Sequence, residues 1–378
     1  MKLIILQDKL KEGLNIVGRI SSKNISLPIL KNILLKAHKN FLELVATDLE
    51  IGIKYWALVK TEQEGEVTVP ASILTNFINY LPQKPVTITT HNNILSLECG
   101  HYTTQIKGQG PEDFPIVPET PEGESVVLNS VLLCRGLAQV VEIPISSTAR
   151  PEISGIYFVF NNNSLKMVAT DSFRLGEKTI YFEKPIVLEN EYTFILPQKT
   201  AKEITNIFGE KEGELKIIFG PNQILFECLM DETKHPQIHL GSRLIEGGYP
   251  NYQEIIPQKY KTQLVLDKNE FLNQIKAASL FSGKTNEIKF KVDPKKETVE
   301  VFSQNSDYGE YRSFLTAKIK GKEGEIAFNY RFLSDGLANI KSSEIIFELD
   351  LEKEEAPGVL KPVGDPSYIY VVMPIRPS

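Results

Sequence analysis

Three groups of residues in this chain have types and spacings that could support chemistry. The first, Gly283-Lys284-Thr285, ends like a phosphate-binding loop, but the position of such a loop's leading glycine is Ala278. The stretch also follows an expected helix, whereas a phosphate-binding loop follows a strand. The sequence therefore does not favour a nucleotide site here.

The second group could bind a metal. His235 and His239 are spaced like two ligands on one helical turn, and Cys228 is near them. Pro236 argues against a helix, there is no CxxC motif, and the glutamate of a metalloprotease motif is missing. We therefore expect loop histidines without a metal. A metalloenzyme remains an alternative, which stoichiometric metal in the purified protein would favour.

The third group consists of Asp48, Glu50 and Asp171, which could act as paired acids. Asp48 and Asp171 each follow a strand-like run at equivalent places in a repeat, so we expect them to stabilise a turn. No serine or cysteine nucleophile motif is present. The sequence thus predicts no catalytic residue, no metal and no cofactor.

These acids belong to a segment that occurs three times. Ala46-Thr47-Asp48 is followed by Ala169-Thr170-Asp171 and, more faintly, by Gln304-Asn305-Ser306-Asp307. A period of roughly 120 to 130 residues is too long for a solenoid unit and indicates duplicated domains. Repeated modules often build a symmetric assembly, so the geometry of that assembly becomes the main guide to function.

The length of 378 residues accommodates three such domains. Proline-rich joins at 114–118 and 249–257 act as stiff connectors, because proline fixes φ and favours an extended residue before it. We expect domains at 1–120, 121–258 and 259–378.

Each copy has two expected helices. The first is amphipathic, with apolar stripes at Leu6, Leu10, Leu14, Val17 and Ile20, at Leu133, Leu137, Val140 and Val141, and at Phe271, Leu272, Ile275 and Ala278. For the second helix, Pro70 and Pro197 suit a first turn and Asn329 suits an N-cap. Short β-branched and aromatic runs separate the helices, which predicts an α+β fold with mostly antiparallel sheets.

The composition is that of a soluble globular protein, with 42% hydrophobic and 24% charged residues. No apolar run reaches the roughly 18 residues of a membrane helix, and we expect no signal peptide, because the start turns polar at Gln7. Three widely spaced cysteines argue against a disulfide framework and for the cytoplasm.

A net charge of −6 neither suggests nor excludes nucleic acid, since a partner also senses where the charges lie. The helix faces opposite the apolar stripes are mostly basic or neutral, although Glu12, Glu270 and Asp335 lie near them. Two interpretations are open: ordinary solvent-facing helices, or one surface that contacts phosphates without sequence preference. The basic residues concerned are Lys11, Arg19, Arg135, Lys199, Lys202, Lys276 and Arg331.

Several motifs together resemble the bacterial DNA polymerase III beta subunits, the sliding clamps. They run in order along the whole chain, at residues 27–30, 46–50, 169–175, 242–247, 249–252 and 371–376. The resemblance implies three repeated clamp domains, each with two helices packed on antiparallel sheets, which form half of a closed ring. Two chains would join head to tail around double-stranded DNA, with twelve helices inside, and would tether the replicative polymerase without any catalytic activity. The implied partners also include a clamp loader and repair polymerases.

The resemblance further implies a hydrophobic pocket for short linear peptides from those partners. By motif, its residues would be Ile153, Thr170, Arg174, Leu175, Pro250, Val371, Met373, Pro374, Ile375 and Arg376. The sequence departs from the family at Ser172-Phe173 and at the tail Pro377-Ser378. A competing hypothesis is a monomeric three-domain scaffold that binds proteins and no nucleic acid.

Overall fold

The computed structural model describes residues 1–21, 27–117, 123–353 and 355–375. Contacts divide the chain into two compact units. Unit 1 comprises Met1–Leu133 and Glu203–Leu244, and unit 2 comprises Cys134–Lys202 and Ile245–Ser378. No helix in the described ranges is long and apolar enough to cross a membrane.

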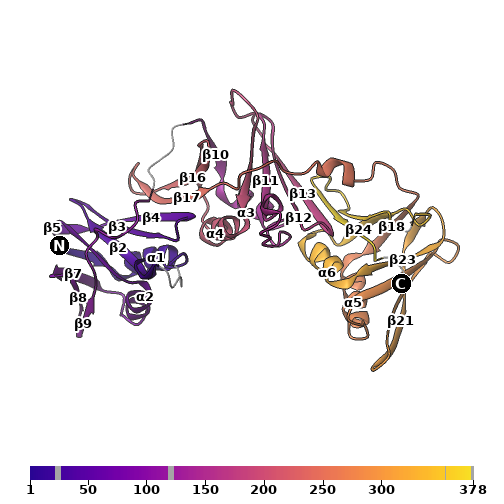
Figure 1. Ribbon diagram of the computed structural model, residues 1–378, viewed down its shortest axis with the longest axis horizontal. Helices are drawn as coiled ribbons and strands as arrows, with labels where there is room; N and C mark the ends of the chain where they lie inside the picture. The colour runs from indigo at the N-terminus through magenta and orange to yellow at the C-terminus, as the bar shows by residue number, and fades with distance from the viewer. Residues whose placement is uncertain (22–26, 118–122, 354, 376–378) are drawn as a thin grey trace. The chain divides into compact units, whose positions relative to one another are not determined.

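Unit 1 contains two antiparallel sheets and the helices α1 (Gln7–Val17) and α2 (Ala71–Asn79), which pack against each other (Figure 1). The five-stranded sheet has the order β5-β1-β7-β8-β9 and the eight-stranded sheet the order β10-β15-β16-β17-β4-β3-β2-β6. Their strands are β1 (Lys2–Leu6), β2 (Asn32–Ala37), β3 (Phe41–Thr47), β4 (Ile51–Leu58), β5 (Lys60–Gln63), β6 (Gly65–Pro70), β7 (Pro85–His91), β8 (Ile94–Cys99), β9 (Tyr102–Lys107), β10 (Ser125–Asn129), β15 (Glu214–Phe219), β16 (Gln223–Leu229) and β17 (Pro236–Arg243).

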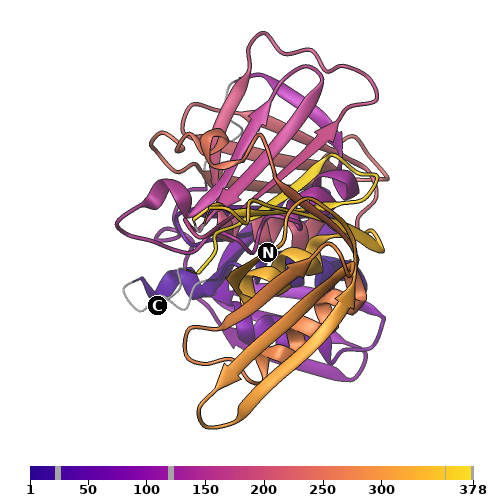
Figure 2. The ribbon, with the colours of Figure 1, turned by 90° about the vertical axis from the view of Figure 1, so that its right-hand side faces the viewer.

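Unit 2 also contains two antiparallel sheets, with the helices α5 (Lys268–Ser279) and α6 (Tyr330–Asn339) packed together. The sheet orders are β14-β11-β12-β13-β26-β25-β24-β18-β22 and β21-β20-β19-β23. Figure 2 shows the four-stranded sheet, on which α5 packs through β20 and β21. The strands are β11 (Gly155–Phe160), β12 (Ser164–Thr170), β13 (Arg174–Tyr181), β14 (Tyr192–Pro197), β18 (Thr262–Asp267), β19 (Glu287–Asp293), β20 (Thr298–Asn305), β21 (Gly309–Thr316), β22 (Lys318–Lys320), β23 (Gly324–Asn329), β24 (Glu344–Leu349), β25 (Gly358–Pro362) and β26 (Tyr368–Val372).

Two further helices, α3 (Ser130–Leu137) and α4 (Gln198–Phe208), each begin in one unit and end in the other. With them, the chain runs three times through a strand, a helix, several strands, a second helix and several strands. Short 3-10 turns at Pro28–Lys31, Pro151–Ile153 and Tyr252–Ile255 complete the described elements. The predicted α+β repeat with antiparallel sheets is confirmed.

The apolar stripes of the helices form the core, as their spacing predicts. Leu10, Leu14 and Val17 of α1 have no exposed surface, and Phe271 and Ile275 of α5 likewise have none. Burying a side chain of this size stabilises the fold by about 1.5–3 kcal/mol. Leu6 is an exception, because it ends strand β1 instead of starting the helix, and it is exposed.

At the helix starts, the predicted position of the two prolines is wrong and the predicted N-cap is confirmed. Pro70 and Pro197 lie just before α2 and α4, as the last residues of β6 and β14. A proline has no N–H to donate, so it fits the end of a strand as well as the first turn of a helix. Asn329 is the expected N-cap of α6, because its side-chain oxygen accepts a hydrogen bond from the Arg331 N–H at 3.0 Å.

Candidate functional site

The repeated Thr-Asp segments form two equivalent turns, which we name turn A (residues 47–51) and turn B (170–174). In turn A the Thr47 hydroxyl donates to the Ile51 carbonyl at 2.8 Å, and Asp48 Oδ1 accepts from the N–H groups of Glu50 and Ile51 at 3.0 and 2.7 Å. A side chain that accepts from backbone two or three residues ahead mimics a backbone turn. Asp48 is therefore a structural residue of this turn.

Turn B repeats the arrangement residue by residue. The Thr170 hydroxyl donates to the Arg174 carbonyl at 2.8 Å, and Asp171 Oδ1 accepts from the N–H groups of Phe173 and Arg174, both at 3.0 Å. Ser172 has φ 76, and its counterpart Leu49 in turn A has φ 79. The expected structural role of both aspartates is confirmed by these bonds.

Turn B differs from turn A in carrying a buried cation. Arg174 Nε donates to Asp171 Oδ2 at 2.9 Å, Nη1 donates to Asp335 of α6, and the guanidinium lies 4.8 Å from the centre of the Phe332 ring. Burial lowers the pKa of Arg174, but Tyr370, Asp335 and Asp171 outweigh it, so the net shift is upward. Arg174 thus ties turn B to α6.

Apolar side chains of the predicted peptide pocket meet beside turn B. Leu175 of β13 and Val371 of β26 are cross-strand partners, and both belong to a cluster with Val168, Tyr252 and Val359. The β26 segment is held to the turn because the Met373 N–H donates to the Phe173 carbonyl at 2.8 Å.

The predicted pocket residues differ in their accessibility. Five are buried, namely Ile153, Thr170, Arg174, Leu175 and Val371. Four are half-buried, namely Pro250, Met373, Pro374 and Ile375. Ile375 pairs with β23, where its N–H donates to the Ala327 carbonyl at 2.8 Å. Arg376 and the departure Pro377-Ser378 lie outside the described residues.

Sequence reasoning missed several residues around turn B. Asp335, which is 161 residues further along the chain, and Phe332 both contact Arg174 from α6. No local sequence pattern reveals such distant contacts. Phe173 is 59% exposed and stacks on Phe332 with ring centres 6.2 Å apart. Arg150 Nη1 donates to the Ser172 hydroxyl at 3.3 Å. The only sequence signal was the departure at Ser172-Phe173.

The basic residues on and beside the helices differ in exposure and in ion pairing. Exposed side chains, as DNA contacts would have to be, belong to Arg19, Arg135, Lys199, Lys276 and Arg331. Arg19 forms a salt bridge with Glu203, and Lys202 forms one with Glu142 at 2.8 Å. Lys11 is half-buried. Acidic neighbours therefore offset part of the positive charge.

The histidine group does not form a metal site. His239 lies within strand β17 and not in a loop, because its neighbours pair with β16 and β4. Its Nε2 is 2.7 Å from Glu227 Oε2, and burial lowers the pKa of its ring, opposed by Glu227. In the described part of the chain, no three His, Cys, Asp or Glu side chains gather as metal ligands.

The fold, with its three α+β repeats and antiparallel sheets, is that of a clamp protein. Family models of the DNA polymerase III beta subunit match three consecutive regions: the N-terminal domain at residues 1–118, the central domain at 129–251 and the C-terminal domain at 253–376. The chain belongs to the DNA polymerase III beta subunit family. It acts as a sliding clamp, the processivity factor of DNA replication.

Individual relatives agree over full length. The chain is 27% identical to a beta sliding clamp of Synechocystis and 28% identical to one of Staphylococcus aureus, covering 100% of this chain and 99% of each relative. A crystal structure of the DNA polymerase sliding clamp from Bacillus subtilis superposes with a TM-score of 0.92 at 25% identity, over 100% of both chains.

Proposed function

We propose that two copies of this chain join head to tail into a closed ring that encircles duplex DNA. The observation that carries the proposal is the threefold repeat, matched over its length by the three beta-subunit domains. Two chains of three domains at 1–120, 121–258 and 259–378 supply six similar modules. A head-to-tail contact produces a ring when the rotation that relates successive subunits returns to the first subunit.

Two sheet edges are suited to the subunit contact. β9 ends the five-stranded sheet and β21 ends the four-stranded sheet, whereas the opposite edge of the latter, β23, is bridged by Pro374. An open edge strand is a template for pairing with another chain. β9 carries the exposed Tyr102 and β21 the exposed Phe314. We propose that β9 of one copy meets β21 of the next.

Solution mass tests the assembly. Light scattering should give twice 42.6 kDa for the wild type. Phe314→Asp should weaken the dimer by about tenfold or more, because it places a charge on the contact. Tyr308→Asp is the control, since Tyr308 is also exposed but lies outside the strand. A monomeric wild type would reject the ring, and a normal Phe314→Asp dimer would place the contact elsewhere.

Inside the ring, we propose that the helices face the DNA through Lys11, Arg19, Arg135, Lys199, Lys202, Lys276 and Arg331. Contacts with phosphates alone carry no sequence information, so the clamp would slide without site preference. The two salt bridges at Arg19 and Lys202 support weak contact. Retention would then depend on the closed ring and not on affinity.

We propose that the surface beside turn B receives linear peptides from the replicative polymerase, the clamp loader and repair polymerases. Its buried floor at Leu175 and Val371, with half-buried Met373 and Pro374 at its margin, resembles the apolar wall of a peptide groove. The clamp itself would have no catalytic activity.

We further propose a cytoplasmic location, where replication takes place. All three cysteines lie in the described residues, are buried and form no disulfide bond, which agrees with a reducing compartment.

A further inference from the structure

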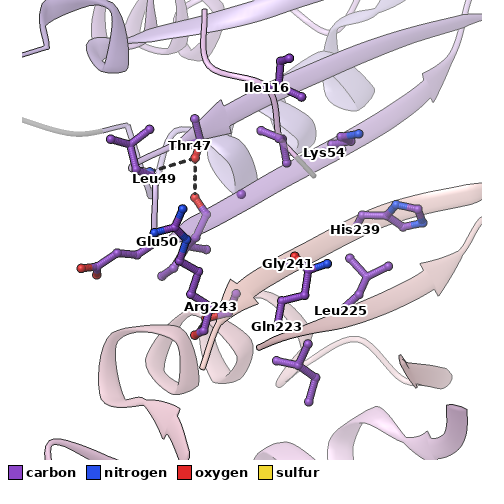
Figure 3. Close-up of a pocket in the computed structure, with 15 residues that line it drawn as sticks. Thr47, Leu49, Glu50, Lys54, Ile116, Gln223, Leu225, His239, Gly241 and Arg243 are labelled. Atoms are coloured by element: carbon purple, nitrogen blue, oxygen red, sulfur yellow. Dashed lines mark hydrogen bonds between the residues drawn. The ribbon is translucent and has the colours of Figure 1, made fainter. Parts of the chain in front are cut away.

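Unit 1 contains a cavity of about 260 Å³ beside turn A. Figure 3 shows it between the start of β4, the end of β17 and the segment that carries Ile116. Leu49 and Ile116 at its margin are exposed apolar side chains. The family-derived pocket is in unit 2, so the resemblance does not account for this cavity.

The hollow lies over a glycine, Gly241, which is paired with a second glycine on the neighbouring strand. Gly52 of β4 and Gly241 of β17 are cross-strand partners, so two neighbouring positions on the sheet have no side chain. A Cβ on Gly52 would lie 2.5 Å from Val117 Cγ1, whereas a Cβ on Gly241 would find no atom closer than 3.7 Å. The space above Gly241 is therefore open.

The cavity is the structural counterpart of the surface beside turn B. The Arg243 N–H donates to the Glu50 carbonyl at 3.0 Å, just as the Met373 N–H donates to the Phe173 carbonyl. The glycine pair occupies the place of the Leu175 and Val371 pair. The same backbone hydrogen-bonding arrangement thus carries apolar side chains beside turn B and an open space beside turn A.

Charged side chains flank the glycine pair along the strands. Side chains at every second residue share one face of a sheet, so His239, Gly241 and Arg243 lie in a row, with Lys54 opposite His239. Neither Lys54 nor Arg243 forms a salt bridge with another described residue. Glu50 extends away from the cavity in Figure 3. Because Lys54 lies opposite His239, it is four residues away from Arg243 along the strand direction, which corresponds to about 13 Å.

We propose that this cavity is a second peptide site, which takes an extended segment of the pattern acid-x-apolar-x-acid from a partner protein. The apolar side chain would fill the space over Gly241, and the carboxylates would pair with Lys54 and Arg243. An extended chain places every second side chain on one face at the same spacing as the sheet beneath it. The choice of a peptide as ligand rests on the proposed role of the equivalent surface beside turn B.

The test uses a fluorescein-labelled peptide, Asp-Ser-Leu-Ser-Asp, titrated with the full-length protein, and a matched peptide in which asparagine replaces both aspartates. The wild type should prefer the aspartate peptide. Gly241→Val introduces the residue that turn B's surface has at this position and should weaken binding at least about tenfold, because it fills the hollow. Arg243→Gln, an exposed change, should reduce the preference for aspartate several-fold.

Met373→Ala separates the two sites, because it alters only the surface beside turn B. It should leave binding of the aspartate peptide unchanged. Binding that survives Gly241→Val but is lost in Met373→Ala would overturn the second site while leaving the proposed function in place. The absence of measurable wild-type binding, or equal binding of both peptides, would also overturn it.

Discussion

Replacing Arg174 with alanine should lower the free energy of unfolding by about 3 kcal/mol, the largest loss we expect from a single polar side chain. The side chain of Arg174 is 8% exposed and that of Asp171 has no exposed surface. Removing the guanidinium leaves a buried carboxylate without its cation, and desolvation of an uncompensated charge is costly. Denaturant unfolding measures the loss.

Asp335→Ala is the matched control for the same network. The Asp335 side chain is 53% exposed, so its salt bridge with Arg174 is screened by water and should contribute less than about 1 kcal/mol. Equal and small effects of both variants would show that the buried pair does not hold turn B.

A comparison of Met373→Ala with Arg174→Ala distinguishes a residue that contacts the peptide from one that supports the proposed peptide surface. Met373 is half-buried at the margin, so Met373→Ala should weaken a polymerase-derived peptide with little change in stability. Arg174→Ala should weaken the peptide and also destabilise unit 2, because turn B loses its tie to α6. Neither variant should change the dimer mass.

Gly336→Ala should also destabilise the protein, although alanine favours a helix over glycine by about 1 kcal/mol. A Cβ at this position in α6 would lie 2.5 Å from two ring atoms of Tyr370. That ring is fully buried, and its hydroxyl donates to the Phe332 carbonyl at 2.8 Å, so it has little room to move. Overpacking of this kind costs about 1–3 kcal/mol.

A helix position that is open to solvent provides the comparison. Asn273→Ala in α5 lies on the exposed face and should raise stability by about 0.5 kcal/mol through helix propensity alone. If Gly336→Ala raised stability to a similar extent, the close packing of α6 on Tyr370 would be refuted.

The sequence predicted the order of elements well, because the same pattern of helices and strands occurs three times along the chain. Apolar spacing identified α1 and α5, and the repeated Thr-Asp segments identified two turns whose bonds match residue by residue. Where local patterns competed, the prediction was wrong. Leu6 continued the helical stripe but belongs to β1, and His239 looked like a loop residue but pairs on both sides within β17.

The contacts that shape the two proposed peptide surfaces could not be predicted from local patterns. Arg174 depends on Asp335 from a distant helix, and the hollow over Gly241 forms where β17 pairs with β4 beneath the segment that carries Ile116. Such pairings are set by tertiary packing, and neither glycine alone marks a cavity in the sequence.

Encirclement of DNA is the central claim, and the topology of the DNA tests it most directly. Clamp loaded onto a closed circular duplex should remain bound at high salt and dissociate when a restriction enzyme linearises the circle, since a ring can then slide off the ends. Direct phosphate binding weakens with salt on circular and linear DNA alike. Equal dissociation from both forms at every salt concentration would contradict a closed ring around the duplex.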